Sequence, residues 1–367
     1  MGNWGGFLKK KNAVLVLEDG TVIYGTGFGA EKEASGEVVF NTSMSGYVES
    51  LTDPSYNSQI LMLTYPLIGN YKVHPDWFES DRIWAEGLIV KEVCENPSHW
   101  KGAQTLDEFL KEFNIPGIMG VDTRVLTIKI RERGVMKGII VTYTGENPSA
   151  AKLLKKVRKQ LSISELDLVS ETTCKQVGEF DGGGKLKVVL IDCGVKRSII
   201  RSLLKRGVSV MCVPASTTSK EIESFEPNGI VISNGPGDPA IVSHVRETVR
   251  KLLPQYPMMG ISLGHQILAL ASGAKTLKLK FGHRGSNHPV KDLETGKVRI
   301  TSQNHGFAVD ADSLEGTGFQ ITKVNCNDNT VEGMSHVELP IISVQYYPEW
   351  DNQYLFDKFV EMLNEYR

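Results

Sequence analysis

The alternation of apolar and polar positions changes character about halfway along the chain. The first half opens with AVLVLEDGTVIYG, in which two apolar runs flank Asp19-Gly20, a dipeptide typical of tight β-hairpins. The runs GEVVF, QILMLTY and EGLIVKEV also predict strands. Residues 105–113 predict a helix, because Thr105 and Glu108 have the spacing of a capping box and apolar residues recur on one face. A second helix is expected over 148–160.

The second half has a regular β/α rhythm. Residues 161–184 lose periodicity and end in three consecutive glycines, which indicates a linker. Beyond it, the strand-like runs KLKVVLID, VSVMCV, GIVIS and PMMGI alternate with helix-like runs across short connections. Such alternation predicts a parallel sheet with helices on both faces. We therefore expect an α/β protein with a mixed β/α N-terminal domain over 1–160, a linker over 161–184 and a C-terminal domain over 185–367.

Three segments that could carry chemistry follow predicted strands of the second half. NGPGDP (234–239) follows GIVIS, Ser262 follows PMMGI, and YYPE (346–349) follows IISVQ. Ligands of open parallel sheets bind beyond the carboxyl ends of the strands. We therefore expect these three segments to form one site.

The composition is that of an ordinary globular protein and excludes several function classes. The net charge of -2 gives no electrostatic reason to expect nucleic acid or an anionic membrane as a partner. No apolar run is long enough to span a membrane, and the N-terminus lacks the apolar core of a signal peptide. The five cysteines are scattered along the chain, so we expect a reducing, cytoplasmic setting without disulfides.

The spacing of potential ligands predicts no metal site. The cysteines include no C-x-x-C pair, and His283, His288 and His305 fit no standard ligand spacing. The sequence therefore favours loop histidines that hydrogen-bond within the protein.

The stretch GISLGHQ raises the question of a serine nucleophile. It contains the G-x-S-x-G pattern of a nucleophile elbow, with Ser262 at its centre. A serine hydroxyl needs an adjacent base, and the histidines that follow it in the chain include His283, His288, His305 and His336. None of them lies in the loop after the last predicted strand, where a base facing the elbow is expected. A serine hydrolase and a structural tight turn both stay open from these residues alone.

The loop SNGPGDP is the second candidate element. Gly235 and Gly237 would let backbone N–H groups turn toward one point, as an oxyanion hole requires. Asp238 can equally cap an ordinary turn. The loop alone leaves both interpretations open.

Longer motifs resemble the class I, triad-type glutamine amidotransferases. The segments that carry this resemblance are SNGPGDP, GISLGHQILALASGAKTLKLKFGHRGSNHPV, TSQNHGFAVD and a closing Q-x-x-P-E. With FNTSMSGYVESLTDPSYNSQILMLTYPLIGNY and GVDTR upstream, the chain resembles the small subunit of carbamoyl phosphate synthase over nearly its whole length. The resemblance implies a flavodoxin-like amidotransferase domain preceded by the small-subunit N-terminal domain.

The resemblance also assigns roles by position. In that family a Cys on the elbow attacks the side-chain amide of glutamine, a His acts as base, a Glu orients the His, and ammonia passes to the large subunit. Ser262 stands at the Cys position, Tyr347 at the His position and Glu349 at the Glu position. The positions of the glutamine pocket, oxyanion-hole glycines included, are Ser55, Gly235, Gly237, Leu263, Gln266, Asn304, Gly306 and Phe307.

The departures from the family pattern predict a disabled glutaminase. The family's Q-G-H-P-E is QYYPE here, so Tyr346 replaces a glycine and Tyr347 replaces the base. A phenol with a reference pKa of about 10 is a poor proton acceptor at neutral pH. Loss of the nucleophile or the base of a triad costs on the order of 10⁶ in turnover. Tyr346 is also expected to intrude on the glutamine pocket.

The resemblance therefore implies a small subunit of carbamoyl phosphate synthase that acts as structural or allosteric partner of an ammonia-using large subunit. That partner would make carbamoyl phosphate from bicarbonate, ATP and a nitrogen donor, for pyrimidine and arginine synthesis. No cofactor is expected in this chain, since ATP and Mg²⁺ belong to the large subunit, and the complex is a hetero-oligomer. Glutamine binding without hydrolysis, an active glutamine amidotransferase with an unforeseen base, and a serine hydrolase are the alternatives.

Overall fold

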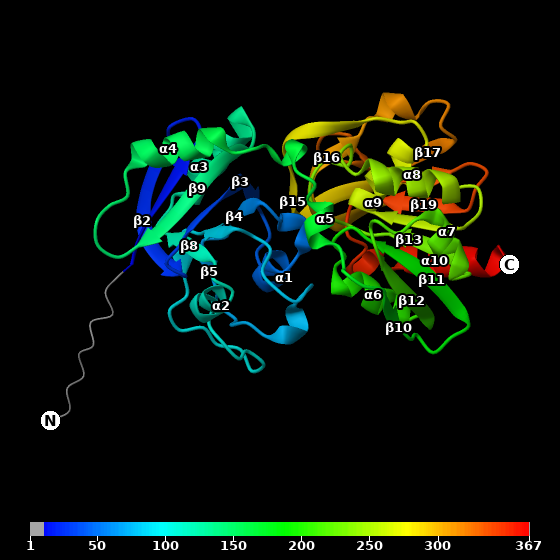
Figure 1. The fold of residues 1–367 in the computed structure, drawn as a ribbon, viewed down its shortest axis with the longest axis horizontal. Helices are drawn as coiled ribbons and strands as arrows, with labels where there is room; N and C mark the ends of the chain where they lie inside the picture. The colour runs from blue at the N-terminus through cyan, green and yellow to red at the C-terminus, as the bar shows by residue number, and fades with distance from the viewer. Residues whose placement is uncertain (1–10, 367) are drawn as a thin grey trace.

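The computed structural model describes residues 11–366, which form two lobes that lie side by side (Figure 1). The N-terminal lobe is built on a closed barrel of seven strands in the order β1-β2-β8-β6-β4-β3-β9. These strands are β1 Asn12–Leu17, β2 Val22–Gly29, β3 Glu33–Asn41, β4 Gln59–Leu63, β6 Gly87–Ile89, β8 Pro116–Met119 and β9 Met136–Tyr143. A separate two-stranded sheet pairs β5 (Leu67–Ile68) with β7 (Glu92–Val93).

The first strand is apolar throughout because both of its faces are covered. Leu15 and Leu17 belong to the apolar core of the barrel. Val14 and Val16 join a second cluster with Val157 of α4 (Ala150–Lys159), which packs on the outside of the barrel. Successive side chains of a strand point to opposite faces, so a strand buried on both sides shows no apolar–polar alternation.

Local sequence signals predicted several elements of this lobe correctly. The β1–β2 hairpin forms, and Gly20 at its turn has a φ of 94°, a conformation that favours glycine. α2 (Leu106–Glu112) begins at the predicted capping box, in which Thr105 Oγ1 accepts a hydrogen bond from Glu108 N at 3.2 Å. α4 occupies the second predicted helix. The remaining helices of the lobe are α1 Tyr47–Leu51, α3 Thr123–Arg133, and the short 3₁₀ helices η1 Pro54–Tyr56 and η2 Pro75–Trp77.

The C-terminal lobe contains the predicted parallel sheet with helices on both faces, which confirms the α/β class. Its parallel strands lie in the order β12-β11-β13-β14-β19. They are β11 Leu186–Asp192, β12 Val208–Pro214, β13 Gly229–Ile232, β14 Met258–Ile261 and β19 Ile341–Val344. One apolar cluster includes α6 (Arg197–Leu204) and α10 (Tyr354–Glu365), and the cluster on the other face includes α7 (Ser219–Ser224), α8 (Ser243–Leu252) and α9 (Leu263–Ala271).

Both edges of this sheet depart from the sequence expectation. The segment 161–184 contains η3 (Ile163–Glu165), α5 (Val169–Thr172) and β10 (Gly178–Phe180), and β10 pairs antiparallel with β12. At the other edge four antiparallel strands extend the sheet: β15 Thr276–Asp292, β16 Val298–Val309, β17 Phe319–Asn325 and β18 Val331–His336. The buried positions of β15 include His283 and Arg284. Because polar side chains occupy such positions, the apolar periodicity that predicts a strand is absent there.

The two lobes meet where β3 lies beside β15, near the centre of the molecule (Figure 1). Thr42 N, just beyond β3, donates to the carbonyl oxygen of Arg284 at 3.1 Å. Phe40 and Phe281 stack with ring centroids 5.9 Å apart. Among the helices of residues 11–366, none combines the length and the apolar character that crossing a membrane requires.

His265 of α9 makes the stability of the lobe depend on pH. Its side chain is fully buried, Nδ1 lies 2.9 Å from Ser343 Oγ, and burial lowers its pKa to about 3. A histidine in the unfolded chain titrates near about 6.5. Between these values the unfolded state binds a proton that the folded state does not, so the free energy of unfolding falls as the pH falls. The effect is at most about 1.4 kcal/mol per pH unit.

We expect a His265→Gln variant to lose less stability than the wild type between about pH 7 and 5. Urea unfolding at a series of pH values measures the slope. His244→Gln, at a half-exposed position of α8, is the matched control and should keep the wild-type slope. An identical slope in all three proteins would contradict the assignment.

Candidate active site at the junction of the lobes

The three segments that were predicted to converge lie together at the carboxyl ends of neighbouring strands. They follow β13, β14 and β19, which are neighbours in the sheet. The N-terminal lobe supplies the facing side chains. Asn234 Nδ2 donates to Ser55 Oγ at 2.9 Å, and the Tyr347 hydroxyl donates to Asp53 Oδ2 at 2.7 Å. The candidate site is therefore built from both lobes.

Ser262 occupies a strained turn between β14 and α9. Its φ of 55° and ψ of -105° lie outside the regions that side-chain-bearing residues favour. The flanking glycines make the turn possible. A Cβ on Gly264 would lie 2.1 Å from the carbonyl oxygen of Ile232, and one on Gly260 would lie 2.5 Å from Leu268 Cδ1. This strand–turn–helix geometry is that of a nucleophile elbow.

No base is hydrogen-bonded to the Ser262 hydroxyl among the described residues. Ser262 is 2% exposed, and within residues 11–366 no hydrogen bond joins its Oγ to a histidine or a carboxylate. His265, one turn along α9, directs Nδ1 at Ser343. His283 and His305 hydrogen-bond to other partners. The described part of the chain thus gives Ser262 no hydrogen-bonded acid–base partner.

The loop after β13 is a tight backbone turn beside the elbow. A Cβ on Gly235 would lie 2.2 Å from the carbonyl oxygen of Cys193 and 2.9 Å from Leu263 Cδ2. Gly237 has a φ of 87°. Asp238 Oδ1 accepts a hydrogen bond from Ala240 N at 2.9 Å and so caps the turn. Both glycines are required by the backbone here, whatever their chemical role.

Tyr347, at the position expected for the base, acts as a hydrogen-bond donor. Its hydroxyl donates to Asp53 Oδ2, and Asn304 Nδ2 donates to the same oxygen at 3.0 Å. The hydroxyl also lies 3.2 Å from Ser55 Oγ. Burial, together with the nearby Asp53 charge, raises the pKa of Tyr347 well above its ordinary value of 10. The phenol is therefore neutral at physiological pH, and its proton is held by Asp53.

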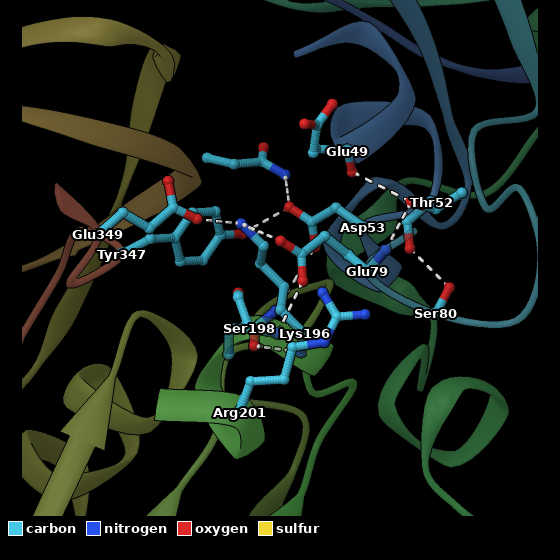
Figure 2. A network of polar contacts seen from close by, with 12 residues as sticks. Glu49, Thr52, Asp53, Glu79, Ser80, Lys196, Ser198, Arg201, Tyr347 and Glu349 are labelled. Carbon is cyan, nitrogen blue, oxygen red and sulfur yellow. Dashed lines mark hydrogen bonds and ion pairs between the residues drawn. The ribbon is translucent and has the colours of Figure 1, made fainter. Parts of the chain in front are cut away.

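Lys196 ties this tyrosine to the surrounding carboxylates (Figure 2). Its Nζ lies 2.6 Å from Glu349 Oε1, 3.5 Å from Glu79 Oε1 and 4.1 Å from the centroid of the Tyr347 ring. Burial opposes the positive charge, but Glu349, Glu79 and Asp53 outweigh it and raise the pKa of Lys196 above its ordinary value. Glu349 is therefore the partner of a lysine, whereas the family pattern expects it to orient a histidine.

A cavity of about 490 Å³ opens beside this network. Its lining includes the acidic residues Glu49, Asp53, Glu79 and Glu349, together with Lys196 and aromatic rings such as that of Tyr347. Ser262 is not one of the lining residues. The cavity therefore gives access to the Asp53–Tyr347–Lys196 network and not to the elbow hydroxyl.

Tyr346 does not intrude on this cavity, contrary to the sequence expectation. It is 1% exposed, belongs to the apolar cluster that includes Phe356 of α10, and is absent from the cavity lining. Both rings belong to the same apolar cluster, but the Tyr347 hydroxyl reaches Asp53 at the junction and Tyr346 does not line the cavity there. Sequence alone could not assign these directions, because both side chains are large, aromatic and capable of either role.

The positions predicted for a glutamine pocket separate into two groups. Ser55 and Asn304 belong to the Asp53 network described above. Leu263, Gln266 and Phe307 are buried, and Gln266 Nε2 donates to the carbonyl oxygen of Phe307 at 2.7 Å. Gly235, Gly237 and Gly306 are half-buried. A Cβ on Gly306 would lie 3.3 Å from Arg284 Nη2.

Sequence analysis missed Asp53 and Lys196. Lys196 follows β11, so the rule that sites lie at the carboxyl ends of parallel strands could have found it. Asp53 comes from the other lobe, where that rule does not apply. Its only local signal is a turn, because Asp53 Oδ1 accepts a hydrogen bond from Ser55 N at 2.9 Å and caps η1.

Family models match two successive parts of the chain. The model described as "Carbamoyl-phosphate synthase small chain, CPSase domain" matches residues 15–140. The model described as "Glutamine amidotransferase class-I" matches residues 189–362. The parallel sheet and its elbow thus define a domain of the class I glutamine amidotransferase type, preceded by the barrel lobe.

Two relatives extend this similarity over almost the whole chain. The carbamoyl phosphate synthase small chain of Archaeoglobus fulgidus is 55% identical over 360 residues, which cover 97% of this chain and 99% of that protein. The carbamoyl phosphate synthase small chain of Methanopyrus kandleri is 52% identical over 360 residues, which cover 96% of this chain and 99% of that protein. The chain belongs to the carbamoyl phosphate synthase small-chain family.

Removing the Tyr347 hydroxyl should weaken the junction of the lobes. A Tyr347→Phe variant keeps the ring but takes one donor from the buried Asp53 carboxylate. We expect the free energy of unfolding to fall by about 1–3 kcal/mol, as measured by urea unfolding. Tyr24→Phe, which changes a ring that is 56% exposed, is the control and should leave stability unchanged. Equal stability of the two variants would show that the hydrogen bond to Asp53 contributes nothing.

Proposed function

We propose that this chain is a small subunit of carbamoyl phosphate synthase that has lost the glutaminase step. The large subunit would make carbamoyl phosphate from bicarbonate, ATP and free ammonia, and this chain would act as its structural or allosteric partner. ATP and Mg²⁺ would bind to the large subunit, and this chain would hold no cofactor of its own. The product would supply pyrimidine and arginine synthesis in the cytoplasm.

The observation that carries this proposal is the hydrogen bond from the Tyr347 hydroxyl to Asp53. Attack on an amide by Ser262 requires a neighbouring group that accepts the hydroxyl proton. The phenol is itself protonated, and its raised pKa prevents it from acting as the conjugate base at neutral pH. Glu349, the other triad position, is paired with Lys196 at 2.6 Å. Neither triad partner is therefore available to Ser262.

The expected loss of rate is large because the members of a triad act as a unit. Removal of the nucleophile or the base alone lowers turnover by on the order of 10⁶. The strained elbow at Ser262 and the glycine turn at Gly235 are consistent with an amidotransferase scaffold that keeps its backbone without its acid–base chemistry.

The nitrogen donor of the complex tests the proposal. The chain is reconstituted with its large subunit, and carbamoyl phosphate formation is measured with glutamine or ammonium as donor. We expect ammonium to support synthesis. With glutamine, we expect a rate at least about 1,000-fold lower than that of a glutamine-hydrolysing synthase with an intact triad. Glutamine-dependent synthesis and ammonia release at ordinary rates would establish an active amidotransferase and overturn the proposal.

A double variant separates loss of the triad from loss of the whole pocket. Ser262→Cys combined with Tyr347→His should gain glutamine-dependent activity, whereas each single variant should not, because nucleophile and base work together. If the double variant gains nothing, more than the triad has been lost. Covalent labelling of Ser262 by an organophosphonate, abolished in Ser262→Ala, would instead support a serine hydrolase.

A further inference from the structure

A compact cluster of buried histidine and carboxylate side chains lies in the antiparallel extension of the sheet. His283 of β15 and His305 of β16 are cross-strand partners with ring centroids 4.9 Å apart, and Glu332 comes from β18. One potential ligand atom from each of these three side chains lies within 4.8 Å of the other two. All three residues are buried, and Glu332 is 0% exposed.

Three polar atoms of this region have no hydrogen-bond partner among residues 11–366. They are His283 Nδ1, His288 Nδ1 and Glu332 Oε2. Glu332 Oε1 accepts a hydrogen bond from Asn325 Nδ2 at 2.9 Å and lies 3.6 Å from His283 Nδ1. Buried polar atoms are almost always paired, so such a concentration of unpaired ones calls for an ion, a proton or a water molecule.

His305, in the same cluster, has more oxygen atoms facing its ring nitrogens than a neutral ring has N–H groups to donate. A neutral His305 ring carries a single N–H. Its two nitrogens nevertheless face two oxygen atoms at 2.7 Å, the carbonyl of Phe307 and Oε1 of Gln303. Turning the Gln303 amide would let its Nε2 donate to His305 Nε2. Thr301 Oγ1 would then have to give up its hydrogen bond to the His288 carbonyl in order to donate to Gln303 Oε1.

Asp328 orients His283 as a carboxylate orients a metal-binding histidine. His283 Nε2 lies 2.8 Å from Asp328 Oδ2, so Nε2 carries the proton and Nδ1 presents a lone pair toward Glu332. Histidines that bind metals almost always donate their other ring N–H to a carboxylate, a carbonyl or water. Two imidazoles and one carboxylate form a ligand set that suits Zn²⁺.

We propose that His283, His305 and Glu332 bind one divalent transition-metal ion, with Zn²⁺ as the preferred ion. The ion would place a positive charge beside the buried Glu332 carboxylate and beside the His305 nitrogen that has no proton to donate. It would also join β15, β16 and β18. The site is structural and separate from the Asp53 network. It would stabilise β16, which carries Phe307, and the carbonyl oxygen of Phe307 accepts a hydrogen bond from Gln266 near the elbow. Sequence spacing missed it because the three ligands come from three different strands.

The competing arrangement is a protonated His283. A second proton on Nδ1 would face Glu332 Oε1 at 3.6 Å, while Nε2 keeps its contact with Asp328 Oδ2 at 2.8 Å. A second compact cluster, formed by Cys174, Asp192 and Cys212, offers another set of metal-binding atoms. There, however, the Asp192 oxygens already accept backbone hydrogen bonds at 2.7 and 2.8 Å. The experiment must therefore distinguish metal binding by the histidine site from a protonated His283 and from metal binding by the cysteine cluster.

Zinc binding by the metal-free full-length chain tests the proposal. Equilibrium dialysis and competition with a chromophoric chelator should give one equivalent of Zn²⁺ in the wild type. Affinity should fall by about 10- to 100-fold in Asp328→Asn, which changes only the orienting carboxylate. His283→Gln and Glu332→Gln should lose at least as much. His244→Gln and Cys174→Ser are matched controls and should bind like the wild type.

Cobalt substitution identifies the ligands. Co²⁺ bound to the wild type should absorb visible light without the charge-transfer band that thiolate ligands produce. Circular dichroism of each metal-free variant checks folding, and His283→Gln carries the test if Glu332→Gln does not fold. No stoichiometric binding, or equal binding by His283→Gln and His244→Gln, would leave the protonated His283 as the correct description. A thiolate band that disappears in Cys174→Ser would assign the ion to the cysteine cluster and overturn the proposal.

Discussion

The junction of the two lobes depends on the hydrogen bonds of one buried carboxylate. Asp53 is 2% exposed, and burial of a charge is costly unless donors surround it. Its two oxygens accept hydrogen bonds from Tyr347, Asn304 and the backbone of Ser55. Two of these donors come from the C-terminal lobe and one from the N-terminal lobe. Separation of the lobes would therefore leave Asp53 without most of its partners.

This structural role is in conflict with acid–base chemistry at the same position. A residue that activates Ser262 has to accept a proton, whereas Asp53 needs a donor at position 347. Tyr347 meets the second requirement, and burial keeps it protonated. Lys196 reinforces the arrangement, because it pairs with Glu349 and lies over the Tyr347 ring. Tyr347 thus bonds directly to the N-terminal lobe, and among the described residues Glu349 is linked to it only through Lys196, which also contacts Glu79.

Much of the fold followed from local patterns. Val189 and Ile191 of β11 belong to the cluster on one face of the sheet, and Val188 and Leu190 belong to the cluster on the other. A run of apolar residues between short helices predicts such a strand because both faces must be covered. The antiparallel extension was missed because buried residues such as His283 contact polar partners that are distant in the chain, here Asp328 in the turn between β17 and β18. No local pattern in a sequence records those partners.

The sequence by itself determined the class of the protein, the elbow at Ser262 and the absence of a histidine at position 347. These conclusions need only residue identity and order, because strand–turn–helix motifs are local. Only the tertiary structure decided that Tyr347 turns to Asp53 while Tyr346 turns into the core. The direction of the Tyr347 hydroxyl depends on Asp53, which is distant in the chain, and such long-range contacts are formed by packing of the two lobes rather than by local preference.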